Sequence, residues 1–270
     1  MDLVDVDANL LHEALRADAP AHIEAAAAVG VRHFVVPGST LEDSVGAIAL
    51  AEKYPAVVFP TVGVHPYNVL ACGPIDDAMA QIRQLASSSL VRCVGETGLD
   101  VSEGFPALEE QMPWFERQVA LACELGKPLF LHERRAHEPF VEVLKRYKSS
   151  GSLPPCLVHS FTGTAEEAQE YLRLGFFLGV AGFLCKPQHG QSLRETVASL
   201  PPNRLMVETD APYLGFPGCR QGHAKPKSQF PNVPSALPAV VTTLAGCMDR
   251  TPAEVAAATT ANARAFFRIA

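Results

Sequence analysis

The stretch Arg204-Leu205-Met206-Val207-Glu208-Thr209-Asp210-Ala211-Pro212-Tyr213 places two acidic residues directly after a short apolar run. Such a run is typical of a strand that is covered on both faces, as strands are in a parallel sheet. Glu208 and Asp210 are two positions apart, so in an extended chain they project to the same side. Two like charges held together are unfavourable unless a cation or a proton lies between them. Taken alone, the stretch could equally place both carboxylates in solvent at the start of a loop.

The same arrangement, an apolar run followed by polar residues, recurs along the chain. The expected strands are residues 3–7, 32–36, 57–62, 91–94, 128–131, 155–158, 176–179 and 204–207. Helical segments are expected between them at residues 19–29, 41–53, 75–87, 108–125, 140–148, 164–174 and 191–199, and further helices finish the chain. Strands that alternate with helices indicate parallel βαβ units. We therefore predict an α/β protein with a single (β/α)8 TIM-type barrel, which forms one domain over residues 1–270.

Composition limits the class of protein. The formal net charge of −7 argues against a protein that coats nucleic acids, because such proteins are usually basic. The seven cysteines are far apart and include no Cys-x-x-Cys pair, which favours reduced thiols over a disulfide framework. The chain begins with an acidic segment and contains no apolar run of the roughly 20 residues that a membrane span needs. We expect a cytoplasmic monomer that does not contact membranes, with the nucleus as a second location.

Residues that commonly bind metal ions follow six of the expected strands. They are Asp5, Asp7 and Asn9 after the first strand, His65 after the third, Glu96 after the fourth, His132 after the fifth, His159 after the sixth, and Glu208 and Asp210 after the eighth. The carboxyl ends of barrel strands meet on one face, where active sites lie. Mixed nitrogen and oxygen ligands suit magnesium, manganese or zinc. A single histidine at a strand end is more often structural, so the prediction depends on the recurrence. Four other histidines lack this placement and are expected to be structural or exposed, namely His12, His22, His33 and His189.

Several sequence blocks occur in an order that points to a known family. They are Gly63-Val64-His65-Pro66, Gly95-Glu96-Thr97-Gly98-Leu99-Asp100, Pro128-Leu129-Phe130-Leu131-His132 with Arg134-Arg135-Ala136-His137-Glu138, Val158-His159-Ser160-Phe161-Thr162-Gly163-Thr164, Glu208-Thr209-Asp210-Ala211-Pro212-Tyr213, and Thr259 to Phe267. Together they resemble the TatD family of metal-dependent deoxyribonucleases, which belongs to the metal-dependent hydrolase superfamily. The resemblance runs from about residue 3 to residue 268.

The resemblance implies a ligand set and a substrate. Glu96, His132, His159 and Asp210 would hold one or two divalent ions, and Glu208 would join Glu96 and Asp210 in the catalytic cluster. Mg²⁺ is the expected ion, with Mn²⁺ or Zn²⁺ as alternatives. The expected reaction is 3′–5′ exonuclease hydrolysis of single-stranded or frayed DNA, in DNA repair or DNA degradation.

The chain departs from the family pattern in two places. Many relatives carry His-x-His after the first strand, where this chain has Asp7 and Asn9. The nearer relatives also lack that pair and keep an Asp-x-x-x-Asn-Leu pattern, and oxygen donors favour magnesium over zinc. The second departure is Lys227-Ser228-Gln229-Phe230, which replaces a common Arg-Asn-Glu-Pro block within residues 214–231. We expect that segment to cover the open end of the barrel.

Roles in catalysis follow from phosphodiester chemistry. We expect Asp210 or Glu208 to take a proton from the attacking water. His65, Asn9, Arg134 and Lys227 are the expected substrate-binding residues. Four aromatic residues are candidates to stack on an unpaired terminal base, although at least two of them should be ordinary core residues: Phe161, Phe183, Tyr213 and Phe216.

Two other functions are compatible with the sequence. A barrel of this superfamily could hydrolyse a small amide, lactone or ester, because the fold does not determine the substrate. A non-catalytic scaffold is the second alternative. The retained Glu96, His132, His159 and Asp210 argue against a scaffold, because four buried polar groups are costly to keep without a use.

Overall fold

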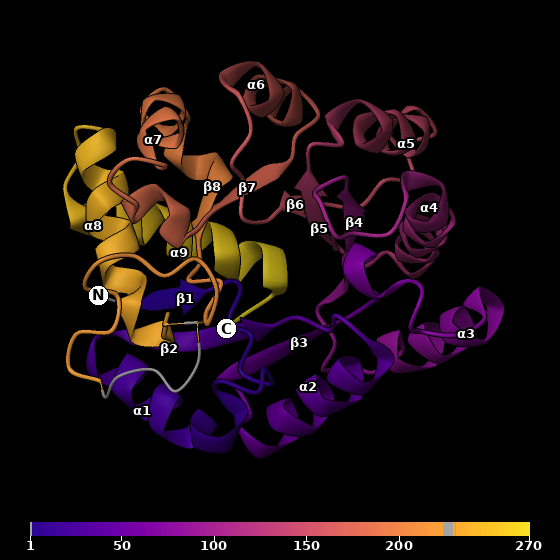
Figure 1. Ribbon diagram of the computed structural model, residues 1–270, viewed down its shortest axis with the longest axis horizontal. Coiled ribbons are helices and arrows are strands. Elements are labelled where there is room, and N and C mark those ends of the chain that lie inside the picture. The colour runs from indigo at the N-terminus through magenta and orange to yellow at the C-terminus, as the bar shows by residue number, and fades with distance from the viewer. Residues whose placement is uncertain (1, 224–228, 230) are drawn as a thin grey trace.

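Eight parallel strands form a single sheet in which each strand pairs with the next one in the sequence. The computed structural model describes residues 2–223, 229 and 231–270. The strands are β1 (Leu3–Asp5), β2 (Val31–Val36), β3 (Val58–Val62), β4 (Cys93–Asp100), β5 (Leu129–Arg134), β6 (Cys156–Val158), β7 (Phe177–Val180) and β8 (Leu205–Val207). Figure 1 shows the strands inside a ring of helices. The predicted barrel architecture is confirmed.

Helices follow the strands and cover the outside of the sheet. They are α1 (Ala19–Ala28), α2 (Leu41–Lys53), α3 (Ile75–Ala86), α4 (Leu108–Leu125), α5 (His137–Ser149), α6 (Ala165–Arg173), α7 (Gln191–Val197), α8 (Leu237–Cys247) and α9 (Pro252–Phe267). The side chains of Thr164 and Thr251 accept hydrogen bonds from the third residue of α6 and of α9, so a capping box begins each of these helices. No helix within the described ranges is both long and apolar enough to cross a membrane.

The first and last strands meet and nearly close the barrel. The amide of Val6 donates to the carbonyl of Val207 at 3.2 Å, and the amide of Asp210 donates to the carbonyl of Asp7 at 2.9 Å. The Asp5 carboxylate accepts hydrogen bonds from the backbone and hydroxyl of Thr209, at 2.8 and 2.6 Å. Asp5 is therefore a structural residue at this seam, and burial raises its pKa well above the ordinary value.

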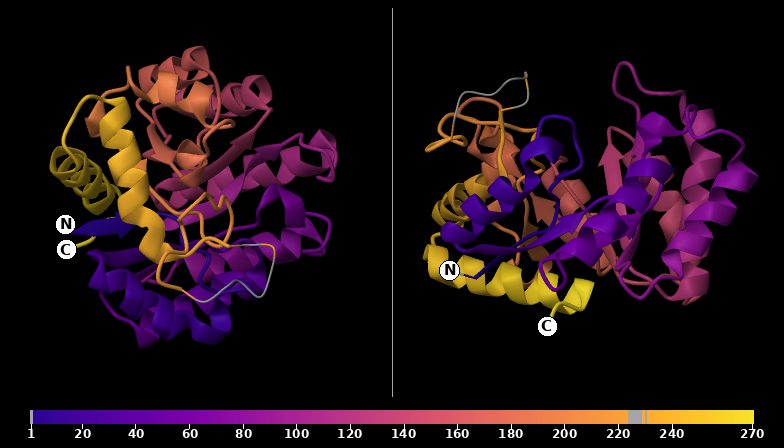
Figure 2. Two further views of the ribbon diagram at one scale, coloured as in Figure 1. Left: turned by 60° about the vertical axis from the view of Figure 1, so that its left-hand side comes forward. Right: turned by 90° about the horizontal axis from the view of Figure 1, so that it is seen from below.

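One end of the barrel is filled with apolar side chains. Residues from inside the strands, such as Val35, Phe130 and Met206, pack against Phe266 and Phe267 of α9. Figure 2 shows α9 along this end of the molecule in its right-hand view, with the segment that follows β8 at the opposite end. The apolar packing leaves the carboxyl ends of the strands as the place for polar groups.

Two strands are longer than predicted. β4 continues to Asp100 and β5 continues to Arg134, so Glu96 and His132 lie within strands and not directly after them. Glycine allows this, because a Cβ at Gly98 would lie 1.7 Å from the carbonyl oxygen of His132. Only a residue without a side chain lets the two strands approach this closely.

Two other boundaries were also predicted wrongly. β1 ends at Asp5 and not at Asp7, since the Asp7 amide turns towards the Asp5 carboxylate. Helix α5 begins at His137, earlier than the predicted residue 140. Its first turn is fixed by Glu133, whose carboxylate accepts the amide of Ala136 at 2.8 Å.

Candidate metal centre

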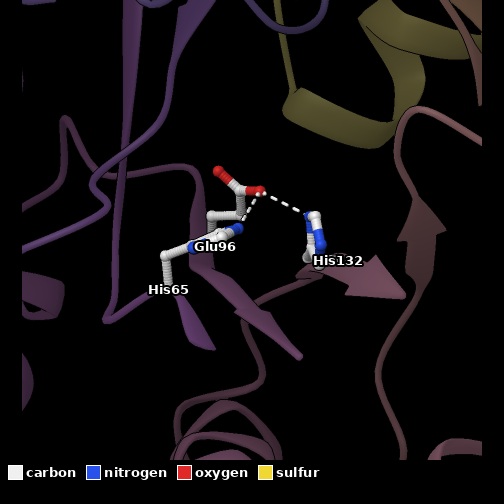
Figure 3. Close-up of side chains that lie close together, drawn as sticks. All are labelled: His65, Glu96 and His132. Carbon is white, nitrogen blue, oxygen red and sulfur yellow. Dashed lines mark hydrogen bonds and ion pairs between the residues drawn. The ribbon is translucent and has the colours of Figure 1, made fainter. Parts of the chain in front are cut away.

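Glu96 lies at the centre of a cluster of histidines at the carboxyl ends of the strands. Its Oε1 atom is 2.8 Å from Nε2 of His159, 3.1 Å from Nδ1 of His132 and 3.3 Å from Nε2 of His65. Figure 3 shows the side chains of His65 and His132 directed towards the Glu96 carboxylate. The four residues come from β4, β5 and the segments after β3 and β6, so the barrel itself assembles the cluster.

Asp100 fixes the orientation of His132. Its Oδ2 lies 2.8 Å from Nε2 of His132, on the side of the ring that faces away from Glu96. Burial alone would raise the pKa of Asp100, but hydrogen bonds with His132 and Ser102 outweigh it and lower the pKa. A carboxylate behind a histidine is the usual means of orienting a metal ligand. Asp100 lay in a quoted sequence block but was absent from the predicted site.

Acidic groups also surround the second nitrogen of His159. Its Nδ1 lies 3.0 Å from Oδ2 of Asp7 and 3.5 Å from Oε1 of Glu208. The contact between Asp7 Oδ2 and His159 Nδ1 does not have hydrogen-bond geometry, and no described residue forms a hydrogen bond with either atom or with Oε2 of Glu208, all of which are buried. Buried polar atoms are nearly always paired. Oxygen and imidazole donors left in this state fit a bound cation.

Asn9 joins Asp7 to Asp210. Its side-chain amide donates to Oδ1 of Asp7 at 3.1 Å and to Oδ1 of Asp210 at 3.2 Å. The predicted extended geometry of Glu208 and Asp210 was wrong, because β8 ends at Val207 and Asp210 has a φ of 53°. Asp210 thus reaches the cluster through a turn, whereas Glu208 accepts a hydrogen bond from the amide of Ser160.

Among the residues that the structure describes, two groups of side chains have the geometry to hold an ion. One contains His65, Glu96 and His132, and the other contains Asp7, Glu96 and His159; within each, the ligand atoms lie within 4.8 Å of one another. Glu96 belongs to both groups. The predicted ligand Asp210 belongs to neither, although Asn9 connects it to Asp7.

The carboxylates of the cluster have pKa values that are shifted in opposite directions. Burial would raise the pKa of Glu96, but His65, His159 and His132 together lower it well below the ordinary value. Burial raises the pKa of Asp7 to about 7, despite its contact with His159. Burial and the charge of Asp7 also raise the pKa of Asp210. Glu96, like Asp100, is therefore stabilised in its ionised form, while Asp7 and Asp210 hold protons more readily.

A cavity of about 630 Å³ lies over the cluster. The lining residues include Asn9, His12, His65, Tyr67, Glu96, Phe105, His132, Arg134, His159, Asp210 and Tyr213. The predicted substrate-binding residues His65, Asn9 and Arg134 thus line one cavity. The Arg134 guanidinium also donates to Thr162, which holds it against the wall. His12, which was expected to be structural or exposed, accepts a hydrogen bond from the amide of Ala14 at 3.1 Å and also lines the cavity.

The remaining predictions for the cavity had mixed outcomes. Phe161 and Phe216 are buried in the core, so neither can stack on a ligand. Phe183 packs against the same core. Tyr213 lines the cavity. Lys227 lies outside the described residues, as does most of the block around it.

A family model described as TatD related DNase matches residues 4–268. This chain belongs to that family. The protein named 3′-5′ ssDNA/RNA exonuclease TatD from Edwardsiella piscicida is 35% identical over 268 residues, which are 99% of this chain and all of that protein. Its namesake from Musicola paradisiaca is 36% identical over 267 residues, 99% of this chain and 98% of that protein.

A solved structure agrees with this assignment. The crystal structure of YJJV, a TatD homologue from Escherichia coli, superposes with a TM-score of 0.87 at 28% identity, covering 99% of this chain and 98% of that one. Within the TatD barrel of this chain, Asp7 was predicted as a strand-end candidate but left out of the ligand set, and Asp100 was not among the predicted site residues. The signal for Asp7 was its place after β1, and the signal for Asp100 was its spacing of four residues from Glu96 on the same strand.

Proposed function

We propose that this TatD-family protein is a divalent-metal-dependent deoxyribonuclease that removes nucleotides from the 3′ end of single-stranded DNA. The observation that carries the proposal is the Glu96 carboxylate, which is shared by two groups of potential ligands at the base of one cavity. The full-length relatives named 3′-5′ ssDNA/RNA exonuclease support both the polarity and the substrate class. RNA is the second substrate to test, because those names include it.

The proposed cofactor is Mg²⁺ at one or two positions. Glu96, His132 and His159 would hold it, with His65 completing one group and Asp7 the other. Asp210 would join through its link to Asn9. The donors would be three imidazoles and two or three carboxylates, a mixed set that also suits manganese and zinc, so those are the ions to compare with magnesium. A divalent ion bound there supplies positive charge that offsets the phosphodiester anion and makes water more acidic.

The residues of the chain would then position the substrate and move a proton. His65 and Arg134 line the cavity and would face the phosphate oxygens. Asp210 is our candidate base, since burial raises its pKa towards the range where a carboxylate accepts a proton well. Asn9 is bonded to Oδ1, so Oδ2 is the atom that would accept the proton. Glu208 is fully buried and bonded to Ser160, so it would position His159.

The shape of the site is consistent with hydrolysis at the end of a DNA strand. Apolar side chains packed against α9 fill the far end of the barrel, so we propose that the substrate approaches the cluster from the carboxyl ends of the strands. We propose that the protein acts as a monomer. Seven free cysteines fit a reducing compartment such as the cytoplasm.

The test is digestion of a single-stranded oligonucleotide that carries a 5′ label. With MgCl₂ we expect a ladder that shortens from the 3′ end, and with EDTA no digestion. The Glu96→Gln variant should fail to digest it while keeping the wild-type circular dichroism spectrum. Digestion that continues in EDTA, or in Glu96→Gln, would contradict the proposal. A panel of amides and lactones tests the alternative substrates under the same conditions.

A further inference from the structure

An aromatic pair, Tyr67 and Phe105, lies at the rim of the cavity and has no part in holding a metal ion. The two rings meet edge to face, with centroids 5.2 Å apart. Both residues line the cavity, and Tyr67 is 59% exposed. Tyr67 is in the 3₁₀ turn Pro66–Asn68 after β3, and Phe105 is in the loop between β4 and α4.

The pair is continuous with the metal centre. The Phe105 ring is nearly parallel to the His132 ring, at an angle of 15° with centroids 6.4 Å apart. It also lies 6.0 Å from the ring of His65. An aromatic surface therefore runs from the two histidines that would hold the ion to Tyr67 at the entrance of the cavity.

The backbone under Tyr67 is fixed. Its amide donates to Nδ1 of His65 at 3.1 Å, and the neighbouring Asn68 side chain donates to the carbonyl of Ser39 at 2.9 Å. Exposed aromatic side chains on fixed backbone are a common feature of binding sites. Exposure alone does not decide the matter, because Leu70 is 66% exposed in the same segment and does not line the cavity.

The charges around the cavity indicate which part of a nucleotide meets this pair. Among the described lining residues, Arg134 is the one guanidinium or ammonium group, and it lies at the end of β5. The phosphate is expected on that side and at the ion, where positive charge is available. The uncharged face of the base would then contact Tyr67 and Phe105 at the rim of the cavity. Stacking suits an exonuclease because every base has an aromatic face.

We propose that Tyr67 and Phe105 form a stacking site for the base of the terminal nucleotide. This inference rests on the proposed nuclease function and adds how the substrate end is recognised. Binding would be insensitive to the identity of the base but would need a base to be present. Phe105 would in addition support His132, so Tyr67, whose ring contacts Phe105 and not the histidines, gives the cleaner test.

The experiment compares two oligonucleotides, one with a normal 3′-terminal nucleotide and one whose terminal nucleotide is abasic. For the wild type we expect KM to rise about fivefold to tenfold on the abasic end, the lower part of the range for base stacking. Tyr67→Ala should raise KM by the same factor on the normal end and leave KM on the abasic end unchanged. Tyr67→Phe should behave as wild type, since the ring is retained.

Leu70→Ala is the matched control and should match the wild type on both substrates. The inference is overturned if Tyr67→Ala leaves KM unchanged for the normal end, or raises KM for both substrates by the same factor. Absence of EDTA-sensitive digestion by the wild type would overturn the proposed function, and the stacking site with it. If the wild type digests DNA and Tyr67→Ala has the KM of the wild type, only the stacking site is overturned.

Discussion

Oε1 of Glu96 lies 2.8 Å from Nε2 of His159, although β5 lies between β4, which carries Glu96, and β6, which His159 follows. This contact crosses the end of the barrel and brings two groups of potential ligands together on one carboxylate. Both residues are buried. A carboxylate and an imidazole placed in this way are costly to keep unless a charge balances them.

Loss of the shared carboxylate should remove ion binding. We expect Glu96→Gln to lower kcat/KM with Mg²⁺ by more than about 100-fold, because the amide cannot offer a charged oxygen to either group. Mg²⁺ should raise the Tm of the wild type, since a ligand that binds only the folded state stabilises it. The variant should lose that rise. Differential scanning calorimetry with and without Mg²⁺ measures it, and Glu24→Gln, at an exposed position on α1, is the control. A full Tm rise in Glu96→Gln would exclude Glu96 as a ligand.

Asp7 should affect the number of ions bound. If Asp7, Glu96 and His159 hold one ion and His65, Glu96 and His132 hold another, Asp7→Asn should lower the number of bound Mn²⁺ ions from two towards one. The amide keeps the shape of the side chain and can still contact Asn9. Titration of Mn²⁺ followed by electron paramagnetic resonance gives the stoichiometry without relying on activity. An unchanged count would assign Asp7 a structural role.

Close packing of β4 on β5 should make Gly98 intolerant of a side chain. A Cβ at Gly98 would lie 1.7 Å from the carbonyl oxygen of His132. We expect Gly98→Ala to lower the free energy of unfolding by about 3 kcal/mol or more, or to prevent folding. Gly104→Ala is the matched control, because Gly104 also has a positive φ, 89°, but nothing lies within 4 Å of its Cβ position.

The control change should cost only about 1 kcal/mol, the cost of the backbone conformation alone. Urea unfolding followed by circular dichroism measures both variants. Equal losses for the two glycines would show that space between the strands is not limiting.

A surface ion pair should make stability depend on pH. The pKa of Glu170 is lowered to about 2, because Lys145 and His137 donate hydrogen bonds to its carboxylate. A lowered pKa means that the unfolded chain binds a proton more readily than the folded chain does. The resulting stability is complete above the ordinary value of 4.5 and is lost as the pH falls towards about 2.

The matching variant is Glu170→Gln. Between pH 7 and pH 3 the wild type should lose more stability than this variant, by at most about 1 kcal/mol, because solvent screens an exposed pair. Urea unfolding at the two pH values measures the difference, with Glu166→Gln on the exposed side of α6 as the control. If Glu170→Gln loses more stability than the wild type between pH 7 and pH 3, the pKa of Glu170 is not lowered by its ion pair.

Much of the site could be predicted from the order of residues. Glu96, His132 and His159 each come shortly after an apolar run that forms a strand. Because a barrel brings the carboxyl ends of its strands to one face, the proximity of these residues could be predicted. The aromatic candidates could not be sorted in the same way. Phe161 and Phe105 both lie in loops after strands, yet one is buried in the core and the other lines the cavity. The difference depends on helices packed from elsewhere in the chain.

The amino-acid sequence by itself determined the barrel and the set of ligand-type side chains, because hydrophobic period and position after a strand are local signals. Only the tertiary structure decided that Glu96 is shared, that Asp7 lies beside His159, and that Asp100 supports His132. Those relationships depend on which atom of each ring and carboxylate faces which neighbour. Strand register, the turn at Asp210 and the close approach at Gly98 set those directions, and all three arise from contacts between distant segments.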